Sequence, residues 1–227
     1  MFYFYNFVPN KFYTAELGHT WSLALEEQFY FTWPFVIHYI KNKKTLLMLG
    51  MTAIVLSVLF LFLIYPIDFL GHFKAHRWFI PAISPIMIGA MLALRIDKIK
   101  EAIPAGLAQF LLFLACYTTP LYFPENLLII SPIFQSFGIV FLLLLIINNQ
   151  DTKGVKLLNN SLTSYIGKVS YGIYVYQGLF LRTGPGSEHW FQQFPQNLIL
   201  TFVVAILSYE LMEKYFLKKK KKYSVVK

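Results

Sequence analysis

The sequence has little cysteine and lacks the marks of several common protein classes. Cys116, its only cysteine, stands inside an apolar run, so the chain has no disulfide framework and no cysteine metal site. The N-terminal residues have no basic segment, and Asn6 and Pro9 interrupt their apolar run, so they are not a signal peptide. There is no repeat of fixed period, and the only low-complexity segment is the lysine run at residues 218–222.

Two motifs that would bind a metal or a phosphate are incomplete. His72 and His76 have a spacing that suits a metal, but no third ligand accompanies them, so we expect no metal site. Gly184, Pro185 and Gly186 predict a turn. They do not form a phosphate-binding loop, because no strand precedes them and no lysine follows in the required pattern.

The sequence as a whole is strongly apolar and carries more basic than acidic residues. Hydrophobic residues make up 57% of the chain, aromatic residues 19%, and the mean hydropathy is +0.54, which is typical of a membrane protein. The 20 Lys and Arg residues outnumber the 11 acidic ones, but five of them form the run Lys218–Lys222 directly after an apolar stretch. Such a run is typical of a membrane surface, so we expect membrane lipid as its partner, and no nucleic acid.

Seven apolar stretches qualify, or nearly qualify, as membrane-spanning helices, which need about 20 residues each. They are residues 21–40, 45–65, 78–94, 105–123, 126–147, 162–182 and 197–217. The sequence therefore predicts an all-α fold, a polytopic membrane helical bundle of about seven transmembrane helices. One membrane domain, residues 1–217, is followed by a basic cytoplasmic tail, residues 218–227.

The basic residues of the short loops predict the orientation, because they remain on the cytoplasmic side. Most follow the odd-numbered stretches: Lys41, Lys43, Lys44, Arg95, Lys98, Lys100, Lys153, Lys156 and the tail. Only Lys11, Lys74, Arg77 and Arg182 lie on the opposite side. We therefore expect an integral protein of the cytoplasmic (inner) membrane with its C-terminus in the cytoplasm.

Two adjacent carboxylates, Glu26 and Glu27, stand near the start of the first stretch. Helical spacing puts Glu26 on one face with Ser22 and Tyr30, and it turns Glu27 about 100° away. One interpretation is that both carboxylates favour the positive end of the helix dipole. The other is that Glu26 borders a polar cavity and orients a substrate or a base there.

Other polar residues also allow two interpretations. His19 is either a solvated residue of the membrane interface or part of an acceptor site. Ser170, Tyr174 and Gln177 share a helical face and either hydrogen-bond between helices or line a substrate passage. Glu210 and Lys214 have the spacing of a structural ion pair.

Four segments together resemble one known family. HTWSLALEEQFYFTWP, within residues 17–34, resembles the signature of the acyltransferase 3 family, membrane enzymes that O-acylate sugars, cell-wall polymers, lipopolysaccharide and macrolides. IMIGAMLAL (86–94), IGKVSYGIYVYQGLF (166–180) and LSYELMEKYF (207–216) resemble later segments of that family. The resemblance covers essentially the whole chain.

The resemblance implies a membrane O-acyltransferase that moves an acyl group, typically acetyl, to a hydroxyl of an envelope or exported carbohydrate. The donor would be acyl-CoA, used as a substrate, with no bound cofactor. Glu26 would be the catalytic residue. Residues implied to bind substrate are His19, Trp21, Ser22, Gln28, Tyr30, Arg77, Ser170, Tyr174 and Gln177.

The chain also departs from the family pattern. Family members usually carry an arginine and a histidine on additional N-terminal helices, so we expect this chain to be an N-terminally truncated member. Gln177 stands where the family often has a histidine, and Ala82 stands where many members have an arginine. Two other functions remain open: a transporter or flippase without acyl transfer, and a non-catalytic remnant.

Overall fold

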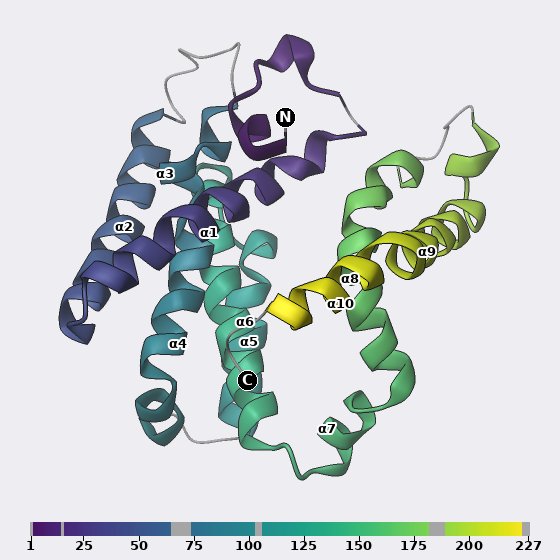
Figure 1. The fold of residues 1–227 in the computed structure, drawn as a ribbon. Coiled ribbons are helices and arrows are strands. Elements are labelled where there is room, and N and C mark those ends of the chain that lie inside the picture. The colour runs from purple at the N-terminus through teal and green to yellow at the C-terminus, as the bar shows by residue number, and fades with distance from the viewer. Residues whose placement is uncertain (1, 15, 65–73, 103–105, 182–188, 224–227) are drawn as a thin grey trace. The chain divides into compact units, whose positions relative to one another are not determined.

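The computed structural model describes residues 2–14, 16–64, 74–102, 106–181 and 189–223. Its α-helices are α1 (Trp21–Tyr39), α2 (Lys43–Ile64), α3 (Phe79–Ala82), α4 (Ser84–Ala102), α5 (Leu107–Tyr117), α6 (Ser131–Asn148), α7 (Lys153–Leu158), α8 (Ser161–Phe180), α9 (Gln196–Ser208) and α10 (Lys214–Tyr223). The described residues contain no strand, so the predicted all-α class is confirmed (Figure 1).

Short helices of other types connect these elements. The 3-10 helices are η1 (Phe2–Phe7), η2 (Asn10–Phe12), η3 (Gly18–Thr20), η5 (Ala75–Arg77), η6 (Thr119–Leu121), η7 (Glu125–Ile130) and η8 (Trp190–Gln192). A π-helical segment, η9 (Tyr209–Glu213), joins α9 to α10. The chain divides into two compact units: the first is Met1–Phe12 with Trp21–Val155, and the second is Tyr13–Thr20 with Lys156–Lys227.

Each predicted stretch contains a helix, but in the described part of the chain only two helical segments are long and apolar enough to cross a membrane. They are Lys43–Leu63 and Glu125–Asn148, with mean hydropathies of 2.7 and 2.4. Only 22% of the most apolar part of each is buried, whereas a core helix of a soluble protein is mostly buried. Two spans are therefore supported by length and composition, and the predicted bundle of about seven is not confirmed.

Two of the other stretches differ from simple spanning helices for physical reasons. The stretch 78–94 is interrupted at Ile83, between α3 and α4. In the stretch 105–123, α5 has 11 residues and is roughly 16 Å long, about half the thickness of a hydrocarbon core.

Proline shapes the junction of α3 and α4. Pro85 has no N–H, so the carbonyl of Pro81 lacks its usual donor in the next helical turn. Ser57 of α2, which is fully buried, donates to that carbonyl at 2.6 Å and lies 3.2 Å from Ser84 Oγ. This contact holds α2 against the α3–α4 junction.

An apolar core lies beside this junction. Its buried members are Phe29 of α1, Ile83 and Met87, and the Trp33 ring stacks on Phe29 with centroids 5.3 Å apart. α1, α2 and α4 therefore share one packed centre in the first unit.

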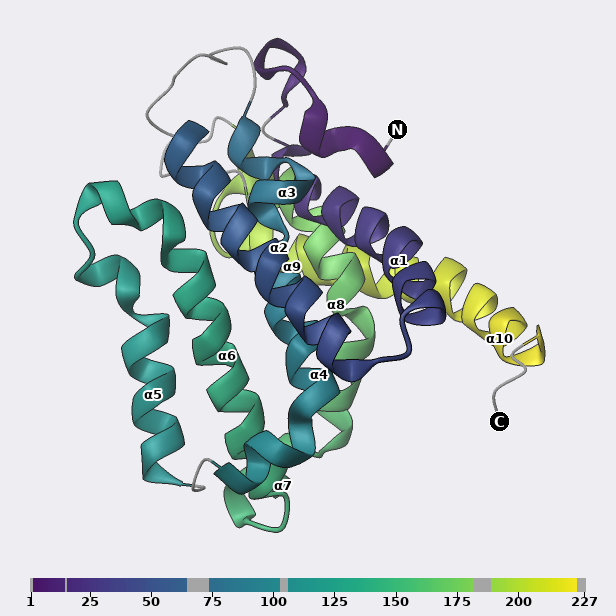
Figure 2. The same ribbon diagram turned by 90° about the vertical axis from the view of Figure 1, so that its left-hand side faces the viewer.

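The hairpin of α5 and α6 in the same unit is closely packed, and the two helices run side by side (Figure 2). A Cβ at Gly138 of α6 would lie 3.0 Å from Tyr117 N and 3.1 Å from Phe113 O. Glycine thus allows the two backbones to approach, as small residues do between membrane helices.

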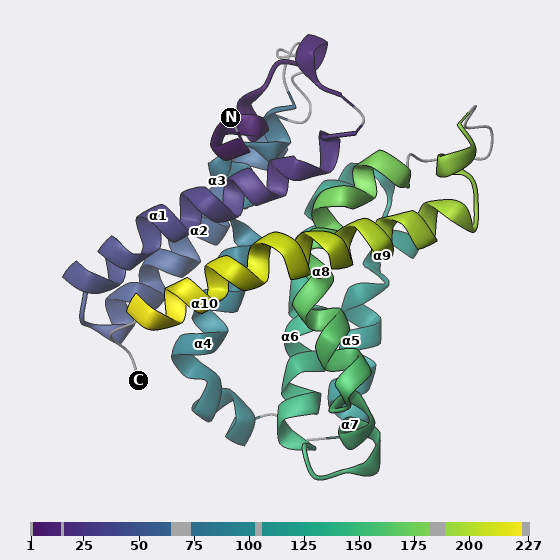
Figure 3. The same cartoon turned by 45° about the vertical axis from the view of Figure 1, so that its right-hand side comes forward.

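The second unit is built on α8. The Asn160 side chain caps its N-terminus by accepting from the backbone N–H groups of Leu162 and Thr163. α9 packs across α8 and continues through η9 into α10 as one long rod (Figure 3). The segment Tyr13–Thr20 also packs on α8 through η3.

Candidate functional site

The first group of candidate residues lies on α1. Ser22, Glu26 and Tyr30 recur at intervals of four residues and share one face of this helix. Glu26 and Tyr30 are exposed. Among the residues that the structure describes, no group hydrogen-bonds or ion-pairs with the Glu26 carboxylate. That carboxylate is thus available to a substrate or to a side chain outside the described residues.

Gln28, on another face of α1, has a structural partner. Its amide exchanges two hydrogen bonds with Asn6 of η1: Gln28 Nε2 donates to Asn6 Oδ1 at 3.0 Å, and Asn6 Nδ2 donates to Gln28 Oε1 at 3.2 Å. Asn6 is only 3% exposed. The pair fastens η1 to α1, a connection that the sequence interpretation of Gln28 did not include.

Arg77 of η5 reaches the start of α1. Its guanidinium carbon lies 5.5 Å from the centroid of the Trp21 ring, a cation–π contact. Arg77 Nε also donates to Nε2 of His76 at 3.3 Å. Partial burial, aided by the charge of Lys74, lowers the pKa of His76 and so favours the neutral ring that accepts this bond. A positive charge and an aromatic ring are thus fixed beside the first turn of α1.

The second group of candidates belongs to the second unit, where His19 packs on α8. The Tyr174 hydroxyl donates to the backbone oxygen of His19 at 2.7 Å, and the two rings meet edge to face at 5.2 Å. His19 Nε2 lies 3.2 Å from the carbonyl oxygen of Val175, which accepts a hydrogen bond from the ring. His19 of η3 is therefore half-buried and packs against α8.

Gly178 makes this contact possible. A Cβ at this position would overlap the backbone oxygen of Glu16 and the ring of His19. The segment 166–180, which carries part of the family resemblance, gave no indication of this role, because the close approach depends on a segment about 160 residues away in the sequence.

Ser170 and Gln177 lie on the same helix as Tyr174. The Ser170 hydroxyl is exposed and donates to the carbonyl of Gly167 in its own helix at 2.8 Å. Gln177 is half-buried, one helical turn after Tyr174. These three side chains share a face of α8, as the spacing predicts.

The ten predicted residues thus form two local sets. The first unit holds Trp21, Ser22, Glu26, Gln28, Tyr30 and Arg77; the second holds His19, Ser170, Tyr174 and Gln177. Asn6 and Gly178 complete these sets and were not predicted. For Asn6, the available signal was a polar residue within an aromatic run.

No group of three His, Cys, Asp or Glu residues that could hold a metal occurs in the described ranges. His72, Arg182 and the predicted turn at residues 184–186 lie outside those ranges.

Among known proteins, one family model matches the chain. The model of the acyltransferase 3 family, described as an acyltransferase domain, matches residues 2–211. No curated protein and no solved structure matches the chain. The family is typically membrane-embedded, in agreement with the two long apolar helices. Since the match covers residues 2–211 of 227, the chain belongs to the acyltransferase 3 family.

Proposed function

We propose that the chain acts in O-acyl transfer at a membrane, moving an acetyl group from acetyl-CoA to a hydroxyl of an envelope or exported carbohydrate. Membership of an acyltransferase family is the observation that carries this proposal. The reaction forms an ester bond between the hydroxyl oxygen and the acetyl carbon and breaks the thioester C–S bond. The hydroxyl proton ends on the released thiol.

The reaction needs a base that takes the hydroxyl proton. In our proposal Glu26 orients that base, a histidine that the family resemblance places on additional N-terminal helices. A carboxylate beside an imidazole fixes its tautomer and stabilises its protonated form. The availability of the Glu26 carboxylate supports this role, since an unpaired carboxylate within an apolar helix is costly unless it serves a partner.

The other candidates have binding roles in this scheme. Trp21, Ser22 and Tyr30 shape the site along α1, and Arg77 keeps Trp21 in place through the cation–π contact. Within the second unit, His19, Ser170, Tyr174 and Gln177 form a set of their own, to which we assign the binding of carbohydrate hydroxyls. The basic residues Lys41, Lys43 and Lys44, around the start of α2, attract the phosphates of the donor electrostatically.

The test uses membrane vesicles from cells that express the gene at its native locus. Vesicles are given acetyl-CoA labelled in the acetyl group, and label is measured in the carbohydrate fraction and in the water-soluble fraction. We expect ester-linked label in carbohydrate, released by mild base and lost when the gene is deleted. Carbohydrate movement across the membrane without thioester consumption would instead identify a transporter.

A further inference from the structure

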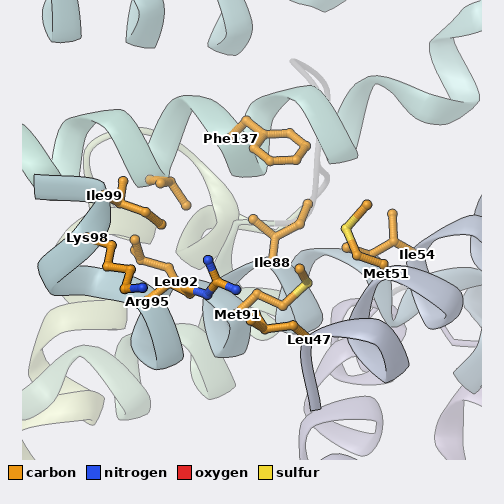
Figure 4. Close-up of a pocket in the computed structure, with 11 residues that line it drawn as sticks. Leu47, Met51, Ile54, Ile88, Met91, Leu92, Arg95, Lys98, Ile99 and Phe137 are labelled. Carbon is orange, nitrogen blue, oxygen red and sulfur yellow. The ribbon is translucent and has the colours of Figure 1, made fainter. Parts of the chain in front are cut away.

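A cleft in the first unit lies apart from the residues assigned to acyl transfer. It has a volume of about 570 Å³ and lies between α2, α4 and α6. Its lining is almost entirely apolar; Met51 and Ile54 come from α2, Ile88 and Met91 from α4, and Phe137 from α6 (Figure 4). Such a volume is within the range of about 300–1,000 Å³ that small-molecule sites occupy.

Two cations stand at one end of this cleft. Arg95 and Lys98 belong to its lining and are three residues apart on α4, a spacing that puts them on neighbouring positions of one helical face (Figure 4). Within the described ranges, neither side chain has an ion-pair or hydrogen-bond partner. Asp97 lies between them in the sequence but does not line the cleft and forms no ion pair with either cation in the described part of the chain. Two adjacent positive charges facing the cleft favour an anion, and a phosphate satisfies both at once.

The length of the cleft matches one leaflet of a bilayer. Ile88 and Lys98 are ten residues apart on α4, which is roughly 15 Å of helix. The hydrocarbon core of a bilayer is about 30 Å thick, so half of it is roughly 15 Å. An acyl chain laid along the cleft would therefore run from the headgroup level to about the middle of the membrane.

We propose that this cleft binds one anionic glycerophospholipid, with an acyl chain against α2, α4 and α6 and its phosphate between Arg95 and Lys98. The charge and the apolar length of the cleft are complementary to such a lipid, whereas a neutral lipid would leave the two cations without a counter-charge. Basic pockets between membrane helices are known binding places for anionic headgroups. The inference requires a membrane-embedded chain but does not depend on acyl transfer.

The test measures lipid binding to the purified, full chain in detergent. A fluorescent phosphatidylglycerol is titrated against the wild type and against the double variant R95Q/K98Q. The matched control is K153Q/K156Q, which removes two exposed charges of α7 that have the same spacing and do not line the cleft. Circular dichroism verifies that all three proteins are equally helical.

We expect R95Q/K98Q to weaken phosphatidylglycerol binding roughly 30-fold. K153Q/K156Q should remain close to the wild type, and phosphatidylcholine should bind weakly to all three. Equal binding by the two double variants would overturn the proposal. Equal affinity for glycerol 3-phosphate, which has no acyl chain, would also overturn it, as would displacement of the lipid by equimolar acetyl-CoA.

Discussion

Gly178 decides whether the segment Tyr13–Thr20 can approach α8. A side chain there would meet the backbone oxygen of Glu16, which cannot rotate away as the end of a flexible side chain can. The position of His19 against Tyr174 and Val175 therefore depends on the absence of a Cβ on Gly178.

We expect G178A to lower the stability of the protein by about 1–3 kcal/mol, the usual cost of overpacking. The matched control is G167A in the same helix, where no atom lies within 4 Å of the added Cβ. That variant should be neutral or stabilised by up to about 1 kcal/mol, since alanine favours helices. Thermal unfolding in detergent compares the two, and equal melting temperatures would refute the contact.

The sequence predicted which residues share a helical face better than it predicted which residues contact one another. The spacing of Ser22, Glu26 and Tyr30 was sufficient to place them on one face, because helical periodicity is a local property. The Asn6–Gln28 pair was not predictable, since it joins residues 22 positions apart through the packing of η1 on α1.

Among the helices, the contact between α2 and the α3–α4 junction rests on one hydroxyl. Ser57 supplies the donor that Pro85 cannot offer to the carbonyl of Pro81. Without this hydroxyl, a buried carbonyl would lose its hydrogen bond, which typically costs about 1–3 kcal/mol.

We therefore expect S57A to lower the free energy of unfolding by about 1–3 kcal/mol. The comparison is S136A, whose hydroxyl bonds the Pro132 carbonyl within its own helix and should change stability by less than about 0.5 kcal/mol. Chemical unfolding in mixed micelles measures both. If S136A lost as much stability as S57A, the hydrogen bond between Ser57 and the Pro81 carbonyl would have no special role in holding the helices together.

The apolar runs of the sequence predicted where the helices lie, but they did not predict where each helix begins and ends. The prolines within residues 78–94 indicated an irregular span, but the break at Ile83 depends on the packing of α3 and α4 against α2. The sequence also did not predict that α5 is short. Its apolar run continues through Thr118 into the 3-10 helix η6, and hydropathy does not detect the change from α-helix to 3-10 helix.

At the scale of the whole molecule, the exposed apolar side chains favour insertion into a membrane, and the basic loops favour one orientation in it. α2 and α6 expose large apolar side chains such as Met48, Leu63 and Leu143, a surface that water disfavours and lipid accepts. Among the described helices, α1 and α8 have the length of a span but carry more polar residues than α2 and α6, so length and composition identify only the latter two.

The orientation can be tested with C-terminal reporter fusions. Because the basic loops favour the cytoplasmic side, we expect a fused green fluorescent protein to fluoresce. A fused alkaline phosphatase should be inactive, since its disulfides form only outside the cytoplasm. An active phosphatase together with a dark fluorescent protein would reverse the proposed orientation.

The most direct test of the account compares E26Q with E27Q, two neutralisations of adjacent carboxylates on different faces of α1. The initial rate of acetyl transfer to carbohydrate is measured in vesicles that contain equal amounts of each protein. We expect E26Q to lower the rate at least about 100-fold, the range for a lost acid–base function, and E27Q to stay within about threefold of the wild type. Transfer by E26Q at the wild-type rate, or equal losses in both variants, would contradict the role assigned to Glu26.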